Sequence, residues 1–121
     1  MYKILVVDDE NDICDFVKTF FKDRGFSVFT ALNAEDAIVI TKKERPNIIL
    51  LDIKMKGMDG LAALRHIRDM DKTIKVIMVT ALEDQEKMRE AYRLGAVDYI
   101  TKPLALDNLE ETVGKNLKVA I

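Results

Sequence analysis

The stretch IILLD, residues 48–52, is the most continuous apolar run in this chain of 121 residues, and it ends in a carboxylate. A run that is apolar at every position is typical of a strand buried on both faces, as in the middle of a parallel sheet. We therefore expect residues 48–51 to form the central strand of an α/β sheet, with Asp52 at its carboxyl end.

Short apolar runs alternate with longer segments of helical period on both sides of this strand. The other predicted strands cover residues 3–7, 26–31, 75–79 and 97–101. Apolar stripes of helical spacing predict the helices. The stripes and boundaries are Ile13, Phe16, Val17, Phe20 and Phe21 before Gly25; a helix from the N-cap Asn33 to about residue 43, before Pro46; Leu61, Leu64 and Ile67; residues 83–94 before Gly95; and Leu106, Leu109, Val113 and Leu117.

Five strands and five helices in strict alternation indicate a specific fold. Right-handed crossovers place helices on both faces of the sheet, so the sequence predicts an α/β, doubly wound, five-stranded parallel sheet. The order 2-1-3-4-5 of flavodoxin-like folds fits five such units. Residues 1–121 are expected to form one domain.

Scarce residues and the charge balance exclude several classes of protein. Cys14 and His66 are the only residues of their types, which excludes an internal disulfide, a Cys-rich zinc site and a His-pair metal site, and indicates a cytoplasmic chain. The net charge of −2 gives no sign of nucleic-acid binding. The apolar runs are too short to span a membrane. Cys14 is expected to pack in the core and His66 to face solvent.

Five polar side chains follow the predicted strands at one pole of the sheet: Asp8, Asp9, Asp52, Thr80 and Lys102. Ligands of doubly wound sheets bind at this pole. Crowded carboxylates stay ionised when a cation neutralises them, and oxygen ligands favour a hard divalent ion such as Mg²⁺, with Mn²⁺ as the alternative. Singly, each side chain also has an ordinary interpretation, for example a helix N-cap for Asp8 or Asp9.

The same constellation suggests phosphoryl transfer in which the protein is the acceptor. A carboxylate attacks already ionised, so no general base is needed, and Lys102 and Thr80 offer a cation and a hydroxyl donor to the phosphoryl oxygens. Physical reasoning alone does not decide whether Asp8 or Asp52 is the nucleophile.

Several short motifs carry a resemblance to a known family when they occur in this order. They are Val7-Asp8-Asp9-Glu10, Leu51-Asp52-Ile53-Lys54-Met55, Gly57-Met58-Asp59-Gly60, Val79-Thr80-Ala81 and Tyr99-Ile100-Thr101-Lys102-Pro103. Over essentially its whole length the chain resembles the receiver domain of two-component response regulators. The resemblance implies that Asp52 is phosphorylated, and that Asp9, Asp52 and the Lys54 backbone carbonyl bind Mg²⁺ with help from Asp8.

The resemblance also implies partners and a switch. The phosphoryl donor is a sensor histidine kinase or a histidine phosphotransfer protein, and the domain catalyses its own phosphorylation and dephosphorylation. Thr80 moves to the phosphoryl group and Tyr99 turns inward, which changes the face formed by the fourth helix, fifth strand and fifth helix. That face would signal to a downstream protein, to the chain's own output domain, or to a second copy in a homodimer. The Lys102-Pro103 bond is expected to be cis.

Two residues depart from the family pattern. Lys56 stands where a proline is usual, and Leu82 offers no hydrogen bond to a hydrolytic water, so we hypothesise slow self-dephosphorylation.

The sequence also bears on alternative functions. The acidic Asp8-Asp9-Glu10 run would repel an FMN phosphate, and the glycines form no phosphate-binding loop. The main alternative is a receiver-fold interaction module that does not cycle phosphate. Tyr99 equally fits a half-buried aromatic without a switching role.

Overall fold

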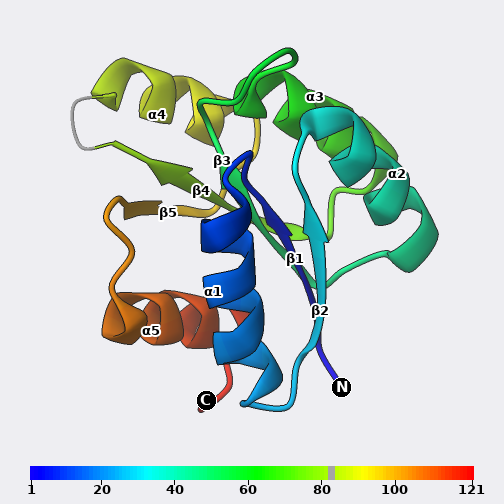
Figure 1. Cartoon of the computed structure of the whole chain (residues 1–121). Helices are drawn as coiled ribbons and strands as arrows, with labels where there is room; N and C mark the ends of the chain where they lie inside the picture. Colours follow the sequence, from blue (N-terminus) through cyan, green and yellow to red (C-terminus); the bar gives the residue numbers. More distant parts are fainter. Residues whose placement is uncertain (82–83) are drawn as a thin grey trace.

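Strands and helices alternate along the chain in the computed structural model, which describes residues 1–81 and 84–121 (Figure 1). The elements, in chain order, are β1 (Lys3–Val7), α1 (Asn11–Lys22), β2 (Ser27–Ala31), α2 (Ala34–Glu44), β3 (Ile48–Asp52), α3 (Gly60–Met70), β4 (Lys75–Thr80), α4 (Gln85–Arg93), β5 (Asp98–Thr101) and α5 (Leu106–Leu117).

All strands of the sheet are parallel, and their order is β2-β1-β3-β4-β5. The predicted fold class and strand order are therefore confirmed. Every residue of β3 is buried, as its unbroken apolar run predicted. In the register, Val7 pairs with Leu51, Asp52 with Val79 and Thr80 with Thr101, so these strands end together at one pole.

Two hydrophobic layers enclose the sheet, one on each face (Figure 1). α1 and α5 cover one face, where Val17, Phe21 and Val113 are fully buried. α2, α3 and α4 cover the other, where Ala37, Leu64 and Ala91 are fully buried. Burial of these apolar side chains against both faces is the main contribution that holds the layers together.

Two apolar residues assigned to buried helical stripes lie at the surface instead. Phe16 in α1 is 44% exposed and Leu106 in α5 is 45% exposed. Phe16 lies at the edge of the α1 stripe, and Leu106 is the first residue of α5, before the helix turns its apolar face to the sheet. Both line one surface hollow together with Phe20.

Side-chain caps define the starts of α2 and α3. The Asn33 side chain accepts a hydrogen bond from the Asp36 backbone N–H at 2.8 Å, as predicted, and Asp59 accepts one from Ala62 N–H at 2.9 Å. Gly60 follows Asp59, and its N–H donates to the Ile53 carbonyl at 2.8 Å. A Cβ on Gly60 would overlap the backbone of Asp52 and Ile53, so only glycine allows α3 to begin this close to β3.

Several predicted boundaries shift by one or two residues. β2 begins at Ser27 and β5 at Asp98, one residue later than predicted, and α4 ends at Arg93. The predicted start of the fourth helix, Glu83, lies outside the described residues, and α4 begins at Gln85. None of the helices described is both long and apolar enough to traverse a lipid bilayer.

Candidate functional site

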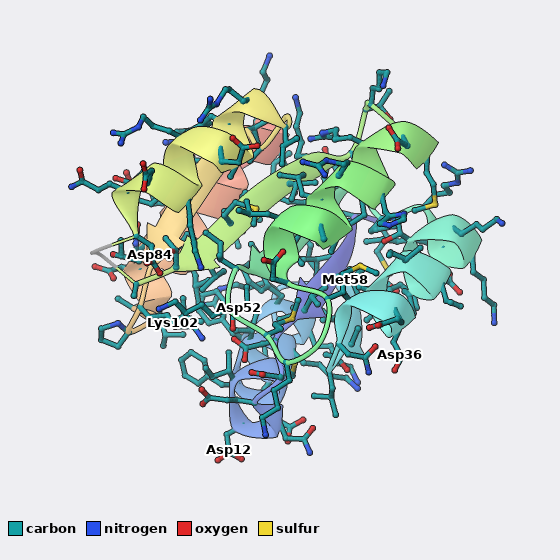
Figure 2. The ribbon with its side chains drawn as sticks, turned by 90° about the horizontal axis from the view of Figure 1, so that it is seen from above. Asp12, Asp36, Asp52, Met58, Asp84 and Lys102 are labelled. Atoms are coloured by element: carbon teal, nitrogen blue, oxygen red, sulfur yellow. The ribbon has the colours of Figure 1, made fainter. Side chains whose placement is uncertain are left out.

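Polar side chains converge at the carboxyl ends of β1, β3, β4 and β5. Asp8 and Asp9 follow β1, Asp52 ends β3, Thr80 ends β4 and Lys102 follows β5. A pocket at this pole is lined by Asp9, Glu10, Asp52, Ile53, Lys54, Thr80, Ala81, Asp84 and Lys102. Viewed from above, Asp52 lies near the middle of the pole with Lys102 and Asp84 to one side, whereas Asp12 and Asp36 lie at the periphery (Figure 2).

Three carboxylates and one ammonium cluster at this pole, with Asp8 buried next to the pocket lined by the other three residues. Oxygen atoms of Asp8, Asp9 and Asp52 all lie within 4.8 Å of one another. Lys102 Nζ lies 3.1 Å from Asp52 Oδ2 and 3.1 Å from Asp8 Oδ2. Asp8 and Asp52 are buried, while Asp9 is exposed. The lysine thus pairs with both buried acids, and these side chains lie at one pole, as their positions after the predicted strands indicated.

The shared lysine does not fully compensate the buried charge. Burial and the neighbouring Asp8 carboxylate raise the pKa of Asp52 to about 6, although the charge of Lys102 and its hydrogen bond lower it. Burial lowers the pKa of Lys102, but the attraction of Asp52 and Asp8 outweighs this effect and raises the pKa above its ordinary value. One cation between two buried acids therefore leaves room for a second cation.

The donor set fits the predicted divalent ion. Asp8 Oδ2 is buried, and no donor among residues 1–81 and 84–121 meets it in hydrogen-bond geometry, although Lys102 Nζ is near. Asp9 Oδ2 accepts a hydrogen bond from the Lys56 backbone N–H at 3.3 Å. A proline at position 56 would have no such N–H, so this departure from the family pattern ties the loop after β3 to Asp9.

The interpretation of Asp8 and Asp9 as caps of α1 is wrong. The N-cap position is Glu10, with no side-chain cap hydrogen bond in the described structure, and Asp8 Oδ1 instead accepts from the Glu10 backbone N–H at 2.9 Å. Cys14 packs beneath this turn, donates its thiol to the Asp8 carbonyl at 3.4 Å, and has its pKa raised to about 11, chiefly by burial. It is a core residue, as predicted, and His66 is exposed, as predicted.

The two predicted switch residues occupy different surroundings. Thr80 is buried beside the pocket, and its hydroxyl donates to the Ala81 carbonyl at 3.2 Å. Tyr99 on β5 is 44% exposed, and its ring meets that of Tyr92 on α4 edge to face at 6.5 Å between centroids. The Lys102-Pro103 peptide is cis, which confirms that expectation. Leu82, on which the hypothesis of slow dephosphorylation partly rests, lies outside the described residues.

One acidic residue of the pocket, Asp84, was missed by the sequence reasoning. The predicted fourth helix included it, but α4 begins only at Gln85, the residue after Asp84, and leaves Asp84 at the pocket wall. Its Oδ2 lies 3.6 Å from Lys54 Nζ. The available signal was position alone, since Asp84 follows β4 at the same pole as the other acids.

A doubly wound parallel sheet with acids at the carboxyl ends of β1 and β3, a threonine at the end of β4 and a lysine directly after β5 is typical of the class of receiver domains. Comparison with known families agrees. Residues 4–114 match the model described as response regulator receiver domain. The chain belongs to this family, which serves two-component signalling.

Relatives of known sequence and structure support the assignment. The chain is 37% identical over 115 residues to sporulation initiation phosphotransferase F of Bacillus subtilis. The alignment covers 95% of this chain and 93% of that relative. It is 37% identical to regulatory protein AtoC of Escherichia coli, but spans only 25% of that protein. Its fold matches the chemotaxis protein CheY4 of Vibrio cholerae with a TM-score of 0.91, at 29% identity over 95% of this chain and 98% of that one. The receiver domain of NtrX from Brucella abortus matches with a TM-score of 0.89, at 35% identity over 97% and 99% of the two chains.

Proposed function

We propose that this chain is a Mg²⁺-dependent phosphoacceptor of a two-component phosphorelay, and that Asp52 accepts the phosphoryl group. The observation that carries the proposal is the position of Asp52, at the floor of the pocket and 3.1 Å from the ammonium of Lys102. The donor is a phosphohistidine on a sensor histidine kinase or a histidine phosphotransfer protein.

The chemistry needs no general base. An Asp52 carboxylate oxygen attacks the phosphorus, a P–O bond forms, the P–N bond to the donor imidazole breaks, and its electron pair stays on the imidazole nitrogen. With a pKa of about 6, Asp52 is mostly ionised at neutral pH and is a competent nucleophile. Catalysis then consists of positioning and charge neutralisation.

Lys102 and Thr80 supply the charge and the donor that the phosphoryl group requires. Lys102 Nζ already contacts the oxygen of Asp52, so it is placed to pair with a phosphoryl oxygen after transfer. Within the described residues, Thr80 Oγ1 donates only to the neighbouring Ala81 carbonyl, so a small rotation would redirect its hydroxyl towards the new acceptor.

Asp8, Asp9, Asp52 and the Lys54 carbonyl are the groups that would hold Mg²⁺. When bound, the ion neutralises the carboxylates and the developing charge on the phosphoryl oxygens. The buried Asp8 Oδ2, which shares the Lys102 ammonium with Asp52, and the cluster of three acids support this ligand set.

The signal is read at the face formed by α4, β5 and α5. Tyr99 and Tyr92 pair on this face, and both are 44% exposed. Movement of Thr80 towards the phosphoryl group vacates space beside β5, which favours an inward turn of Tyr99. The recipient is a downstream protein, an output domain or a second copy of the chain. Similarity to a sporulation phosphotransferase over 93% of its length supports a place in a multi-step phosphorelay.

Intact-mass measurement tests the function directly. The chain is incubated with Mg²⁺ and either acetyl phosphate or phosphoramidate, whose P–N bond resembles that of a phosphohistidine. We expect one added phosphoryl group, lost in Asp52→Ala and with EDTA, and retained in the matched control Asp12→Ala at the periphery of the same pole. Absence of the adduct with every donor and metal would favour an interaction module that does not cycle phosphate.

A further inference from the structure

The pair of Lys54 and Asp84 links the phosphoacceptor pocket to the start of α4. Lys54 lies in the loop after β3, and Asp84 is the residue directly before α4. Both line the pocket that contains Asp52, and their charged atoms, Nζ and Oδ2, lie 3.6 Å apart. The pair therefore joins the loops that follow two neighbouring strands.

The Asp84 carboxylate lacks a hydrogen bond to its buried oxygen in the described structure. Its Oδ2 is buried without a hydrogen-bond partner in the part of the chain that the structure describes, and Lys54 approaches it at a distance longer than a hydrogen bond. The Lys54 side chain is 63% exposed, so its ammonium is free to move. A buried carboxylate oxygen held by one mobile cation is easily released when that cation finds a stronger anion.

The N-terminus of α4 offers Asp84 a better partner. Asp84 is the N-cap residue of α4, yet its side chain accepts no cap hydrogen bond within the described structure. By contrast, Asn33 and Asp59 cap α2 and α3, with ψ values of 168° and 173°. Asp84 has a ψ of 46°, so its backbone is not in the extended conformation of these caps. The orientation of Asp84 towards Lys54 thus leaves the first-turn N–H groups of α4 without this cap.

We propose that phosphorylation of Asp52 takes Lys54 from Asp84 and releases Asp84 to cap α4. Phosphorylation replaces the single negative charge of the Asp52 carboxylate with about −1.5 to −2 on a phosphoryl group with three acceptor oxygens, which outcompetes a single carboxylate for the ammonium of Lys54. The same charge repels Asp84, while the positive end of the α4 dipole attracts it. The exchange converts a new charge in the pocket into a tighter first turn of α4. This inference rests on the proposed function.

Amide hydrogen exchange at Glu86 and Lys87, in the first turn of α4, tests whether Asp84 leaves Lys54 and caps the helix. On phosphorylation of the unaltered chain we expect about fivefold slower exchange, the effect of one N-cap hydrogen bond. Lys54→Gln and Asp84→Asn should slow exchange to a similar extent without phosphate, because each breaks the ion pair while keeping a capping side chain at position 84. Asp84→Ala should abolish the response to phosphorylation.

Lys56→Gln is the matched control, because it removes the same charge from an exposed lysine of the same loop that forms no ion pair with any described residue. It should leave exchange in α4 unchanged. Fast exchange in both Lys54→Gln and Asp84→Asn, or a full phosphorylation response in Asp84→Ala, overturns the proposal.

Intact mass is recorded on the same samples to separate the two proposals. An adduct on Asp52 with no change in α4 overturns only the exchange of partners. If no adduct forms, the proposed function fails and the phosphoryl-driven exchange with it, while the unphosphorylated variants still show whether Lys54 restrains Asp84.

Discussion

Replacing Asp52 by asparagine is expected to stabilise the metal-free fold at pH 7.5. The pKa of Asp52 rises from 3.8 to about 6 on folding, because burial and the Asp8 charge outweigh the attraction of Lys102. At 1.36 kcal/mol per pKa unit, the ionised carboxylate costs about 3 kcal/mol. Solvent screening at the open pocket reduces this to about 1–2 kcal/mol. Asparagine removes the charge and keeps an oxygen that accepts a hydrogen bond from Lys102.

The upward direction of the Asp52 pKa shift determines how the free energy of unfolding depends on pH. The folded chain binds the proton of Asp52 more tightly than the unfolded chain, so the free energy of unfolding falls as pH rises from about 4 to about 6 and then levels off. Asp52→Asn lacks this contribution. Its advantage should be full above about pH 6.5 and should be only a small fraction of this at about pH 4, where the folded carboxyl group is protonated and the unfolded one is about half protonated.

Urea denaturation in EDTA, followed by circular dichroism between pH 4 and pH 8, measures the effect. Asp12→Asn is the control, because Asp12 is an exposed acid at the periphery of the pole and should show no such pH-dependent gain. A variant that is less stable than the parent at pH 7.5, or one whose advantage is the same at pH 4, would refute the assignment of Asp52 as a destabilised buried charge.

Three other perturbations follow from the same geometry. Mg²⁺ should raise Tm more at pH 7.5 than at pH 5, because at pH 5 it must displace the proton of Asp52; an equal rise at both pH values would contradict the ligand set. Lys102→Met should raise the pKa of Asp52 above about 6 and abolish the phosphoryl adduct, as NMR titration and intact mass would show; an unchanged pKa would contradict the ion pair. Gly60→Ala should lower the free energy of unfolding by about 1–3 kcal/mol in urea, because its Cβ overlaps the Asp52 backbone, whereas Ala62→Gly, which adds no atom, should cost no more than about 1 kcal/mol.

The sheet and most of the pocket could be predicted from the sequence because both follow from local patterns. An unbroken apolar run at 48–51 identifies a strand buried on both faces, and polar residues directly after such strands must meet at one pole. Asp8, Asp9, Asp52, Thr80 and Lys102 were found in this way. The choice of Asp52 as phosphoacceptor, by contrast, came from the family resemblance and not from spacing.

Features that depend on where a helix begins were not predictable. Asp84 fell inside the predicted fourth helix, residues 83–94, and its position at the pocket wall follows from a helix that begins at Gln85, two residues later than predicted. Phe16 fits the apolar period of α1, but periodicity does not say how wide a stripe the sheet covers. Both errors concern the edge of an element, where neighbouring elements decide what is buried.

The charges of the pocket explain why the proposed phosphorylation should reorganise its rim. Above about pH 6 the three carboxylates and Lys102 leave a net charge of −2, which one divalent cation neutralises. A phosphoryl group then adds up to one further negative charge, because the acyl phosphate replaces the charge of the Asp52 carboxylate with up to two charges. Among the described residues that line the pocket, the remaining cation is Lys54, and its ammonium already forms an ion pair with Asp84. The added charge therefore competes for Lys54, and Asp84, placed at the start of α4, is the group that must find a new partner.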